Sequence, residues 1–197
     1  MREMTKLKKL VIAAICAAMC YVLPIAFHGM GVGSILSPMH IPVLLCGLIC
    51  GGGYGVLCGL VGPVLSSLLS SMPPALMLTR MIPELCAYGL VAGLGMRYVK
   101  TGRAAVDVFI SLAVAMILGR IVGGIATAIF FAVTSGSYSI ALWATSYFVE
   151  SVPGIAAHLI LVPALYAALV KARLIPGRYR KGPLYTKKRP DGRFFLF

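Results

Sequence analysis

The chain has 197 residues, of which 60% are hydrophobic and 12% charged, and its mean hydropathy is +0.96. Since about a quarter of the residues in a soluble domain are charged, this composition excludes an ordinary soluble protein and indicates an integral membrane protein. In a soluble protein, the net charge of +13 would indicate nucleic-acid binding. Here most basic residues gather in three clusters at the ends of apolar stretches, Arg2 to Lys9, Arg97 to Arg103 and Lys171 to Arg193. This distribution favours membrane topology and attraction to anionic lipid over nucleic-acid binding.

Six apolar helices are predicted from apolar runs separated by Gly, Pro or charged breaks. In chain order they cover residues 10–27, 41–50, 54–70 and 79–96, and two further spans within 104–170 that are divided near residues 134–137. A membrane helix needs about 20 mostly apolar residues, so the second helix is short and is expected to tilt or to be partly re-entrant. Pro24 is expected to kink or end the first helix, and Pro83 to lie in the first turn of the fourth helix or at a kink.

The breaks between these helices predict the topology. Gly51-Gly52-Gly53 separates the second helix from the third, Ser71 to Pro74 forms a turn, and residues 97–103 form a basic loop. The connections predicted on the other side, residues 28–40, 71–78 and 135–142, contain no Lys or Arg. Six spans leave both ends of the chain on one side, and basic segments stay in the cytoplasm. The sequence therefore predicts an all-α integral membrane bundle of six transmembrane helices with both termini cytoplasmic.

Motifs for enzymatic or nucleotide chemistry do not occur. The chain has no Walker A motif, no Gly-x-Ser-x-Gly elbow and no His-Glu-x-x-His pair. Six cysteines lie in apolar runs, at Cys16, Cys20, Cys46, Cys50, Cys58 and Cys86. No His or carboxylate completes a tetrahedral metal set near them, so they are interpreted as small buried side chains. We predict no metal, no cofactor and no disulfide framework.

Ionisable groups at membrane depth are the main functional signal. Insertion of one such group at a helix centre costs about 2.5–3.5 kcal/mol, so these groups face the bundle interior and pair, or mark a site. Two interpretations stand: Arg80–Glu84 and Arg120–Glu150 are ion pairs that fix helix packing, or they line a polar pocket that opens outward between the fourth to sixth helices. Weaker candidates are His40 and His158, and three aromatic residues are available for stacking, Tyr88, Trp143 and Tyr147.

Small residues in the first helix form two overlapping Ala-x-x-x-Ala patterns, Ala13/Ala17 and Ala14/Ala18. Small residues four positions apart let another helix approach closely. By themselves the patterns are explained as well by packing inside the chain or by chance in an Ala-rich span.

Several stretches together resemble a known family. They are the basic N-terminus that runs into Ala13-Ala14-Ile15-Cys16-Ala17-Ala18, the segment Ser37 to Gly47, the segment Gly59 to Leu69, and Met72-Pro73-Pro74. Over residues 5–172, the chain resembles the substrate-binding S components of energy-coupling factor (ECF) vitamin transporters, which are small six-helix proteins.

The resemblance implies a function and a set of partners. An S component binds its ligand in a pocket near the outer face, closed by loops such as residues 28–40 and 71–78, in the plasma membrane of a bacterium. Import requires a transmembrane coupling subunit (EcfT) and two ATPase subunits, and the Ala-x-x-x-Ala motif, as Ala13/Ala17 or Ala14/Ala18, docks against the coupling subunit. Residues 1–172 then form the substrate-binding domain, and residues 173–197 a basic cytoplasmic tail.

The function expected from the sequence is capture of a small water-soluble vitamin or vitamin precursor for ATP-driven import. The alternatives are a structural or assembly subunit of a membrane complex and an intramembrane enzyme without a recognisable motif. Two ligands are weighed. Arg80 and Arg120 suit a carboxylate, as in pantothenate, whereas Tyr88, Trp143 and Tyr147 suit stacking on a pyrimidine thiamine precursor.

Overall fold

The computed structural model describes residues 4–29, 38–71, 73–134, 145 and 152–179, and every regular element in them that is longer than one residue is a helix. The six helices are α1 (Lys6–Gly29), α3 (His40–Cys50), α4 (Gly52–Ser70), α5 (Ala75–Tyr98), α6 (Ala104–Val133) and α8 (Val152–Lys171). Four of them, α1, α4, α6 and α8, are long and apolar enough to cross a membrane. The fifth long helix, α5, carries Arg80, Glu84 and Arg97 and is therefore less apolar. The predicted all-helical membrane fold is confirmed.

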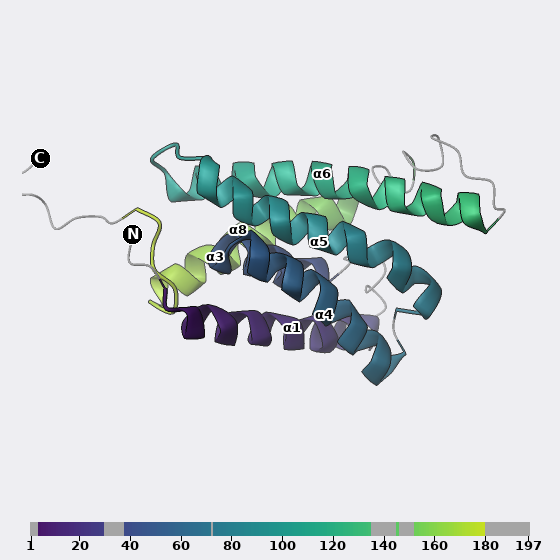
Figure 1. Ribbon diagram of the computed structural model, residues 1–197. Helices are drawn as coiled ribbons and strands as arrows, with labels where there is room; N and C mark the ends of the chain where they lie inside the picture. Colours follow the sequence, from purple (N-terminus) through teal and green to yellow (C-terminus); the bar gives the residue numbers. More distant parts are fainter. Residues whose placement is uncertain (1–3, 30–37, 72, 135–144, 146–151, 180–197) are drawn as a thin grey trace, which may run out of the picture.

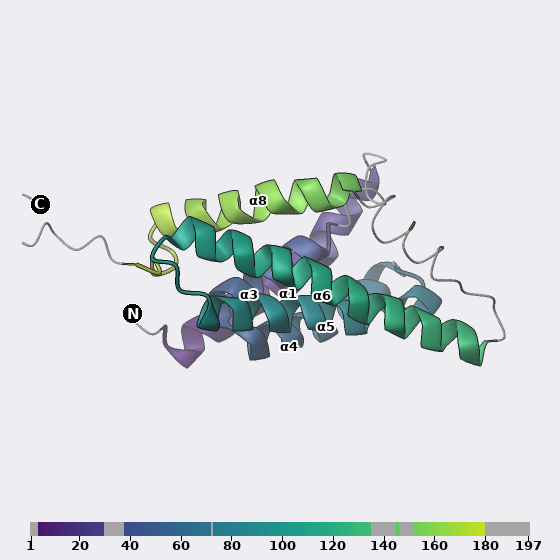
Figure 2. The same cartoon turned by 90° about the horizontal axis from the view of Figure 1, so that it is seen from above.

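The helices run along a common direction, and α5 lies at the centre (Figure 1). It packs against α3, α4 and α6, while α1 packs against α3 and α4. In the view from above, α8 and α4 lie on opposite sides of the bundle (Figure 2), and α8 contacts α3 and α6. The first residues of α1 and the last of α8 lie at the same end (Figure 1). We call it the basic end, because the turn from α5 to α6 with Arg97, Lys100 and Arg103 lies there too.

Glycines let α3, α4 and α5 pack with their backbones in contact. A Cβ added at Gly89 of α5 would lie 2.4 Å from the carbonyl oxygen of Gly55 in α4, and one added at Gly47 of α3 would lie 2.4 Å from the carbonyl oxygen of Gly89. At the basic end, a Cβ at Gly93 would lie 2.0 Å from the nitrogen of Gly52. No side chain fits at these positions, so the glycines fix the place of α5 in the bundle.

Five of the six cysteines are buried, on α1, α3 and α4, and none is in a disulfide. Thiols there donate weak hydrogen bonds to carbonyl oxygens of other segments: Cys50 to Lys9 at 3.5 Å and Cys46 to Tyr54 at 3.4 Å. Across the described part of the chain, no group of three or more His, Cys, Asp or Glu is arranged to hold a metal ion. Because five cysteines are buried where α1, α3 and α4 meet, they serve as small packing side chains.

Several predicted boundaries change. Pro24 does not end the first helix, because α1 continues to Gly29, and Pro83 lies in the third turn of α5 rather than the first. Membrane helices accept such prolines where neighbouring helices satisfy the freed backbone groups. Of the three consecutive glycines, only Gly51 breaks the chain, with a φ of 99°, while Gly52 and Gly53 begin α4.

The last two predicted spans are only partly described. Residues 104–170 contain α6 and α8, but most of the connection between them lies outside the described residues. The segment 30–37 of the predicted loop 28–40 also lies outside them, and His40 belongs to α3 rather than to that loop.

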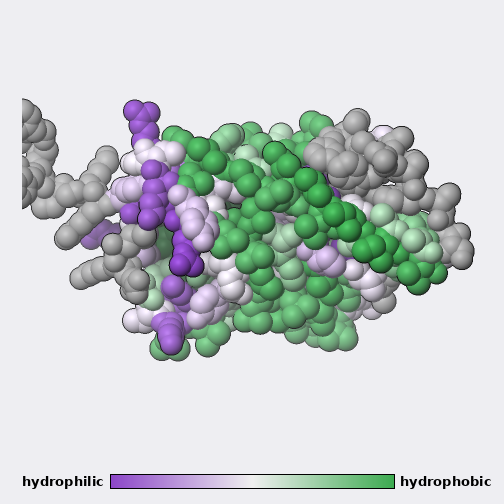
Figure 3. Space-filling view, turned by 45° about the horizontal axis from the view of Figure 1, so that its top comes forward, coloured by the Kyte–Doolittle hydropathy of each residue, from purple (hydrophilic) through white to green (hydrophobic). Residues whose placement is uncertain are grey.

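The surface is the reverse of that of a soluble protein. Hydrophobic side chains form a continuous band, and hydrophilic ones gather at the basic end (Figure 3). Large apolar side chains on the band are well exposed, such as Leu10 on α1 at 52%, Ile125 on α6 at 55% and Ile160 on α8 at 73%. Such a band matches the hydrocarbon layer of a bilayer.

Candidate functional site

The half-length helix α3 sets the depth of the candidate site. Its 11 residues span about 16 Å, roughly half of the ~30 Å hydrocarbon core of a bilayer. Its last residue, Cys50, lies at the basic end, where its thiol donates a hydrogen bond to the carbonyl oxygen of Lys9 in the first turn of α1. His40, its first residue, therefore lies about halfway through the bundle.

Four side chains meet at this helix start, and we call them the central polar cluster: partly buried His40 of α3, and buried Glu84 and Tyr88 of α5 and His158 of α8. The Tyr88 hydroxyl donates a hydrogen bond to Glu84 Oε1 at 2.9 Å, and His40 Nε2 lies 3.7 Å from the same oxygen. The His40 ring meets that of Tyr88 edge-on at 5.1 Å and lies 5.6 Å from that of His158. Three helices thus contribute polar side chains to one point.

Helix α6 closes the cluster with glycines. A Cβ added at Gly119 would lie 2.4 Å from the Tyr88 ring, and one added at Gly123 would lie 2.8 Å from Glu84 Oε2. Arg120, between these glycines in sequence, is buried. The hydroxyl of Thr127, one turn after Gly123, donates a hydrogen bond to the Gly123 carbonyl oxygen. The Gly-x-x-x-Gly spacing gives the α5 side chains room to point inward.

Burial at this depth is costly and therefore informative. Glu84 is 8% exposed, Arg120 7% and His158 2%. Ionisable groups inside a bilayer are retained where they pair or serve a site. Glu84 accepts a hydrogen bond from Tyr88, and His40 faces it. The groups that meet here, one carboxylate, one phenol hydroxyl and two imidazoles, can bind a polar ligand.

Arg80 does not form the ion pair with Glu84 that the sequence suggests. The guanidinium of Arg80 lies 5.8 and 5.9 Å from the ring centroids of Phe130 and Phe131 on α6, a cation–π arrangement. Glu84 faces His40 instead. The two side chains are one helical turn apart on α5, but each packs against a different neighbour, so spacing alone predicts the wrong pair.

The structure brings together part of the predicted site. His40, Glu84 and Tyr88 lie in the central polar cluster, and Arg80 lies one turn away from Glu84 on α5. Arg120 is buried on α6, between the two glycines that contact Tyr88 and Glu84. The predicted residues Trp143, Tyr147 and Glu150 lie outside the described residues, so the Arg120–Glu150 pairing stays a prediction.

His158 and two glycines of α6 contribute more to the site than their sequence pattern indicates. His158 was a weaker candidate and yet lies in the cluster, because a single histidine in an apolar helix gives no sign of its partners. Gly119 and Gly123 were missed, although their Gly-x-x-x-Gly spacing is visible in the sequence.

The alanines of α1 separate into two faces. Ala13 and Ala17 are buried at 5% and 8% exposed, whereas Ala14 and Ala18 are exposed. Ala13 and Ala17 therefore pack inside the chain and are no candidates for docking. Of the two registers that the sequence leaves open, only Ala14/Ala18 is accessible to another protein.

Comparison with known proteins identifies the family. A family model described as "ECF transporter, substrate-specific component" matches residues 8–166, which include all six helices up to the last turns of α8. No curated protein and no solved structure gives a significant match. The family match, the apolar band and the buried polar cluster agree: this chain belongs to the substrate-specific components of ECF transporters, multi-pass membrane subunits that confer substrate specificity on a transporter.

Proposed function

We propose that the chain captures a small water-soluble vitamin or vitamin precursor and delivers it to an ATP-driven coupling complex. Membership of the family implies a substrate and partner subunits. The observation that carries the proposal is the convergence of the central polar cluster on the N-terminus of a half-length helix. The cluster faces the side away from the basic end, which we place in the cytoplasm because basic segments stay there. Residues 1–172 then form the substrate-binding domain and residues 173–197 a cytoplasmic tail.

The chemistry of the site favours a ligand with a negatively charged group over a ligand held only by stacking. Arg80 and Arg120 are the two cations on the ligand side of the bundle, and α3 directs the positive end of its dipole to the cluster. Tyr88 is 1% exposed and its ring is covered by Gly119, so α6 occupies a stacking position on it. Of the two ligands weighed, pantothenate fits these features better than a pyrimidine thiamine precursor.

The first experiment identifies the ligand. The protein is purified in detergent, extracted with organic solvent and analysed by mass spectrometry, and radiolabelled pantothenate is tested for binding to the stripped protein. We expect a carboxylate-containing compound in the extract. A protein that carries no small molecule and binds neither pantothenate nor the pyrimidine precursor would favour the structural-subunit alternative.

A second experiment asks whether Arg120 contacts the ligand. Replacing both members of a structural ion pair by apolar residues often costs little, whereas removing one leaves an unpaired buried charge. Arg120→Ala, Glu150→Ala and Arg120→Met/Glu150→Leu are compared. If Arg120 binds ligand, the double variant recovers thermal stability but not affinity, because the polar ligand loses its partner. Recovery of both would remove the two residues from the site.

We also propose that the exposed face of α1 docks the coupling subunit. Ala14 and Ala18 share the exposed surface of α1 with Val11, Ile15 and Val22, and small residues four apart permit close helix contact. An apolar face of this kind is also compatible with lipid, so docking needs a direct test.

The two alanine faces supply a matched test of docking. Ala14→Trp adds bulk to the exposed face, so it should abolish co-purification with the coupling subunit and leave the melting temperature and ligand binding unchanged. Ala17→Trp adds the same bulk to the buried face, so it should lower the melting temperature by overpacking. Ala14→Trp protein that still co-purifies with the coupling subunit would exclude this face.

A further inference from the structure

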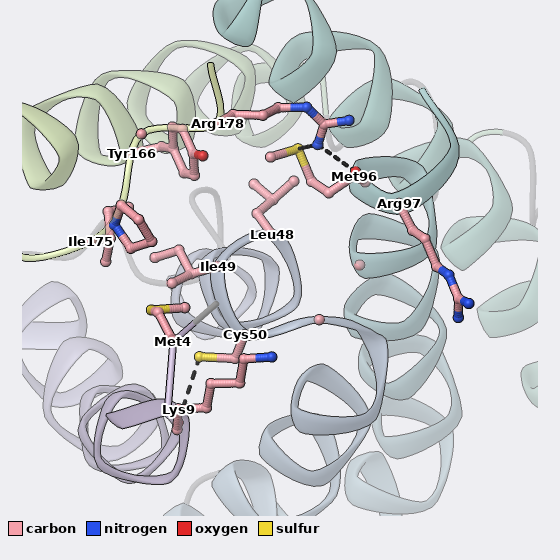
Figure 4. A pocket seen from close by; sticks show the side chains of 14 residues that line it. Met4, Lys9, Leu48, Ile49, Cys50, Met96, Arg97, Tyr166, Ile175 and Arg178 are labelled. Carbon is pink, nitrogen blue, oxygen red and sulfur yellow. Dashed lines mark hydrogen bonds between the residues drawn. The ribbon is translucent and has the colours of Figure 1, made fainter. Parts of the chain in front are cut away.

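A second candidate site lies at the basic end, separate from the central polar cluster. A cavity of about 580 Å³ lies between the start of α1, the turn from α3 to α4, the end of α5 and the segment after α8. Apolar side chains, among them Leu48, Ile49 and Ile175, line much of it (Figure 4). A neighbouring hollow of about 520 Å³ shares part of its wall and is lined by Lys8 and Arg173.

The wall formed by the segment after α8 is firmly held. The Arg178 guanidinium pairs with Asp107 at 2.6 Å and donates to the carbonyl oxygens of Met96 and Val99. The Tyr179 hydroxyl donates to the same carboxylate oxygen, Oδ2, at 2.6 Å, and Thr101 donates to Oδ1. Asp107 is fully buried, so this network fixes the segment against α5 and α6 and gives the cavity a defined shape.

The cavity carries an excess of positive charge. Three basic residues lie around it: Lys9 on α1, Arg178 after α8, and Arg97 on α5, whose exposed side chain points away from the cavity (Figure 4) and lies over the ring of Tyr98. Arg178 is neutralised by Asp107, but neither Lys9 nor Arg97 takes part in an ion pair among the described residues. Lys9 reaches toward the turn between α3 and α4 (Figure 4). There Gly51 precedes α4, and no side chain of the described residues caps the start of the helix, so the first N–H groups of α4 add to the positive potential.

We propose that this cavity binds the phosphate headgroup of an anionic glycerophospholipid. Basic pockets between membrane helices on the cytoplasmic side suit such headgroups, and Lys and Arg form strong, charge-assisted hydrogen bonds to phosphate. The mixed lining matches both parts of the molecule: Lys9 and the first N–H groups of α4 meet the phosphate, and Leu48 and Ile49 meet the glycerol and the first acyl carbons.

The position of the cavity favours a lipid over a free anion. Its lining residues place it at the basic end, and there hydrophilic side chains gather beside the apolar band (Figure 3). Phosphates of a bilayer lie at the level of such a boundary. Beside the cavity, exposed Leu7 and Leu10 on α1 continue the apolar surface that acyl chains cover. A soluble phosphate would use the cations but not this apolar lining.

The test is a lipid titration of the full chain in dodecyl maltoside, followed by native mass spectrometry. The probes are dioleoylphosphatidylglycerol and dioleoylphosphatidylcholine, which have the same acyl chains and differ in headgroup charge. The wild-type protein is compared with Lys9→Gln, which keeps a long polar side chain but removes the charge that faces the cavity and has no ion-pair partner among the described residues. The matched control is Lys100→Gln, which removes one exposed charge from the same end but outside the cavity.

We expect phosphatidylglycerol to bind the wild-type and control proteins in preference to phosphatidylcholine. Each basic side chain near a membrane surface is worth about a fivefold change in affinity, so Lys9→Gln should bind phosphatidylglycerol about fivefold more weakly. A third variant, Ile49→Trp, fills the cavity without changing its charge and should also lose the lipid. If Ile49→Trp does not fold, the two charge variants decide the question.

Four results would overturn the proposal. They are equal binding of the two lipids, equal loss in the cavity and control variants, full binding by folded Ile49→Trp, and displacement of the lipid by millimolar inorganic phosphate. The first two would indicate general attraction to the basic end. The third would indicate binding outside the cavity, and the fourth a free-anion site.

Discussion

Gly123 offers a direct test of whether Glu84 belongs to the substrate site. A Cβ at this position would lie 2.8 Å from Glu84 Oε2 and 2.9 Å from its Cδ, about 0.6 Å inside ordinary van der Waals contact. The Glu84 side chain ends in a rotatable carboxylate, so Gly123→Ala should push the carboxylate aside. The displacement would disturb the 2.9 Å hydrogen bond from Tyr88 and the approach of His40.

The expected stability change is small because two effects oppose each other. Alanine is favoured over glycine within a helix by about 1 kcal/mol, whereas overpacking costs about 1–3 kcal/mol. Affinity should change more. A hydrogen bond to a charged group contributes about 1.5–3 kcal/mol, so loss of the contact between ligand and Glu84 should weaken binding about tenfold to a hundredfold.

Two further glycines make the experiment decisive. Gly119→Ala puts a Cβ 2.4 Å from the buried Tyr88 ring, which has no room to turn, so it should chiefly lower the melting temperature. Gly53→Ala adds a Cβ with nothing within 4 Å and should change neither property. Thermal melts measure the stability of each variant, and calorimetric titration with the compound extracted from the wild-type protein measures its ligand affinity. If stable Gly123→Ala protein binds that compound as tightly as the wild type, the reasoning about Glu84 fails.

Three other predictions concern topology and the basic end. In intact cells and a cysteine-free background, an impermeant thiol reagent should label a cysteine introduced at Ser34 but not one at Gly102; labelling of Gly102 would contradict the cytoplasmic assignment of the basic end. Asp107→Asn should destabilise the protein by about 3–5 kcal/mol in thermal or denaturant unfolding, because it leaves the buried Arg178 charge unpaired; an unchanged melting temperature would show that the pair is not buried in the membrane-embedded protein. Gly51→Ala should cost about 1–2 kcal/mol in the same assay because the φ of 99° strains any residue with a Cβ, and a gain in stability would refute that local geometry.

The membrane character of the protein could be predicted from the sequence because it depends on local composition. Long uncharged stretches and clustered basic residues predict where helices lie and which loops share a side. The short helix before Gly51 was predicted as residues 41–50 and is found as His40–Cys50. Proline was a poorer guide, since α1 continues past Pro24 and α5 contains Pro83.

The partners of the charged side chains could not be predicted in the same way. Arg80 and Glu84 are one turn apart on α5, which suggests a pair, but the choice of partner depends on which neighbouring helix each side chain meets. Phe130 and Phe131 lie against Arg80, and His40 lies against Glu84. Those neighbours are 40 or more residues away in the chain, and no local pattern encodes them.

By itself, the sequence determined that the chain is a helical membrane protein, approximately where its helices begin and end, and its resemblance to a transporter family. Hydrophobicity and helix propensity are properties of short segments, so they can be predicted without knowledge of the tertiary structure. Tertiary structure decided which alanine face of α1 is free, Ala14/Ala18 rather than Ala13/Ala17, and that His158 joins His40 and Glu84. Both outcomes depend on how each helix is rotated about its axis, and that rotation follows from contacts between helices, such as that of Gly62 in α4 with Cys20 in α1.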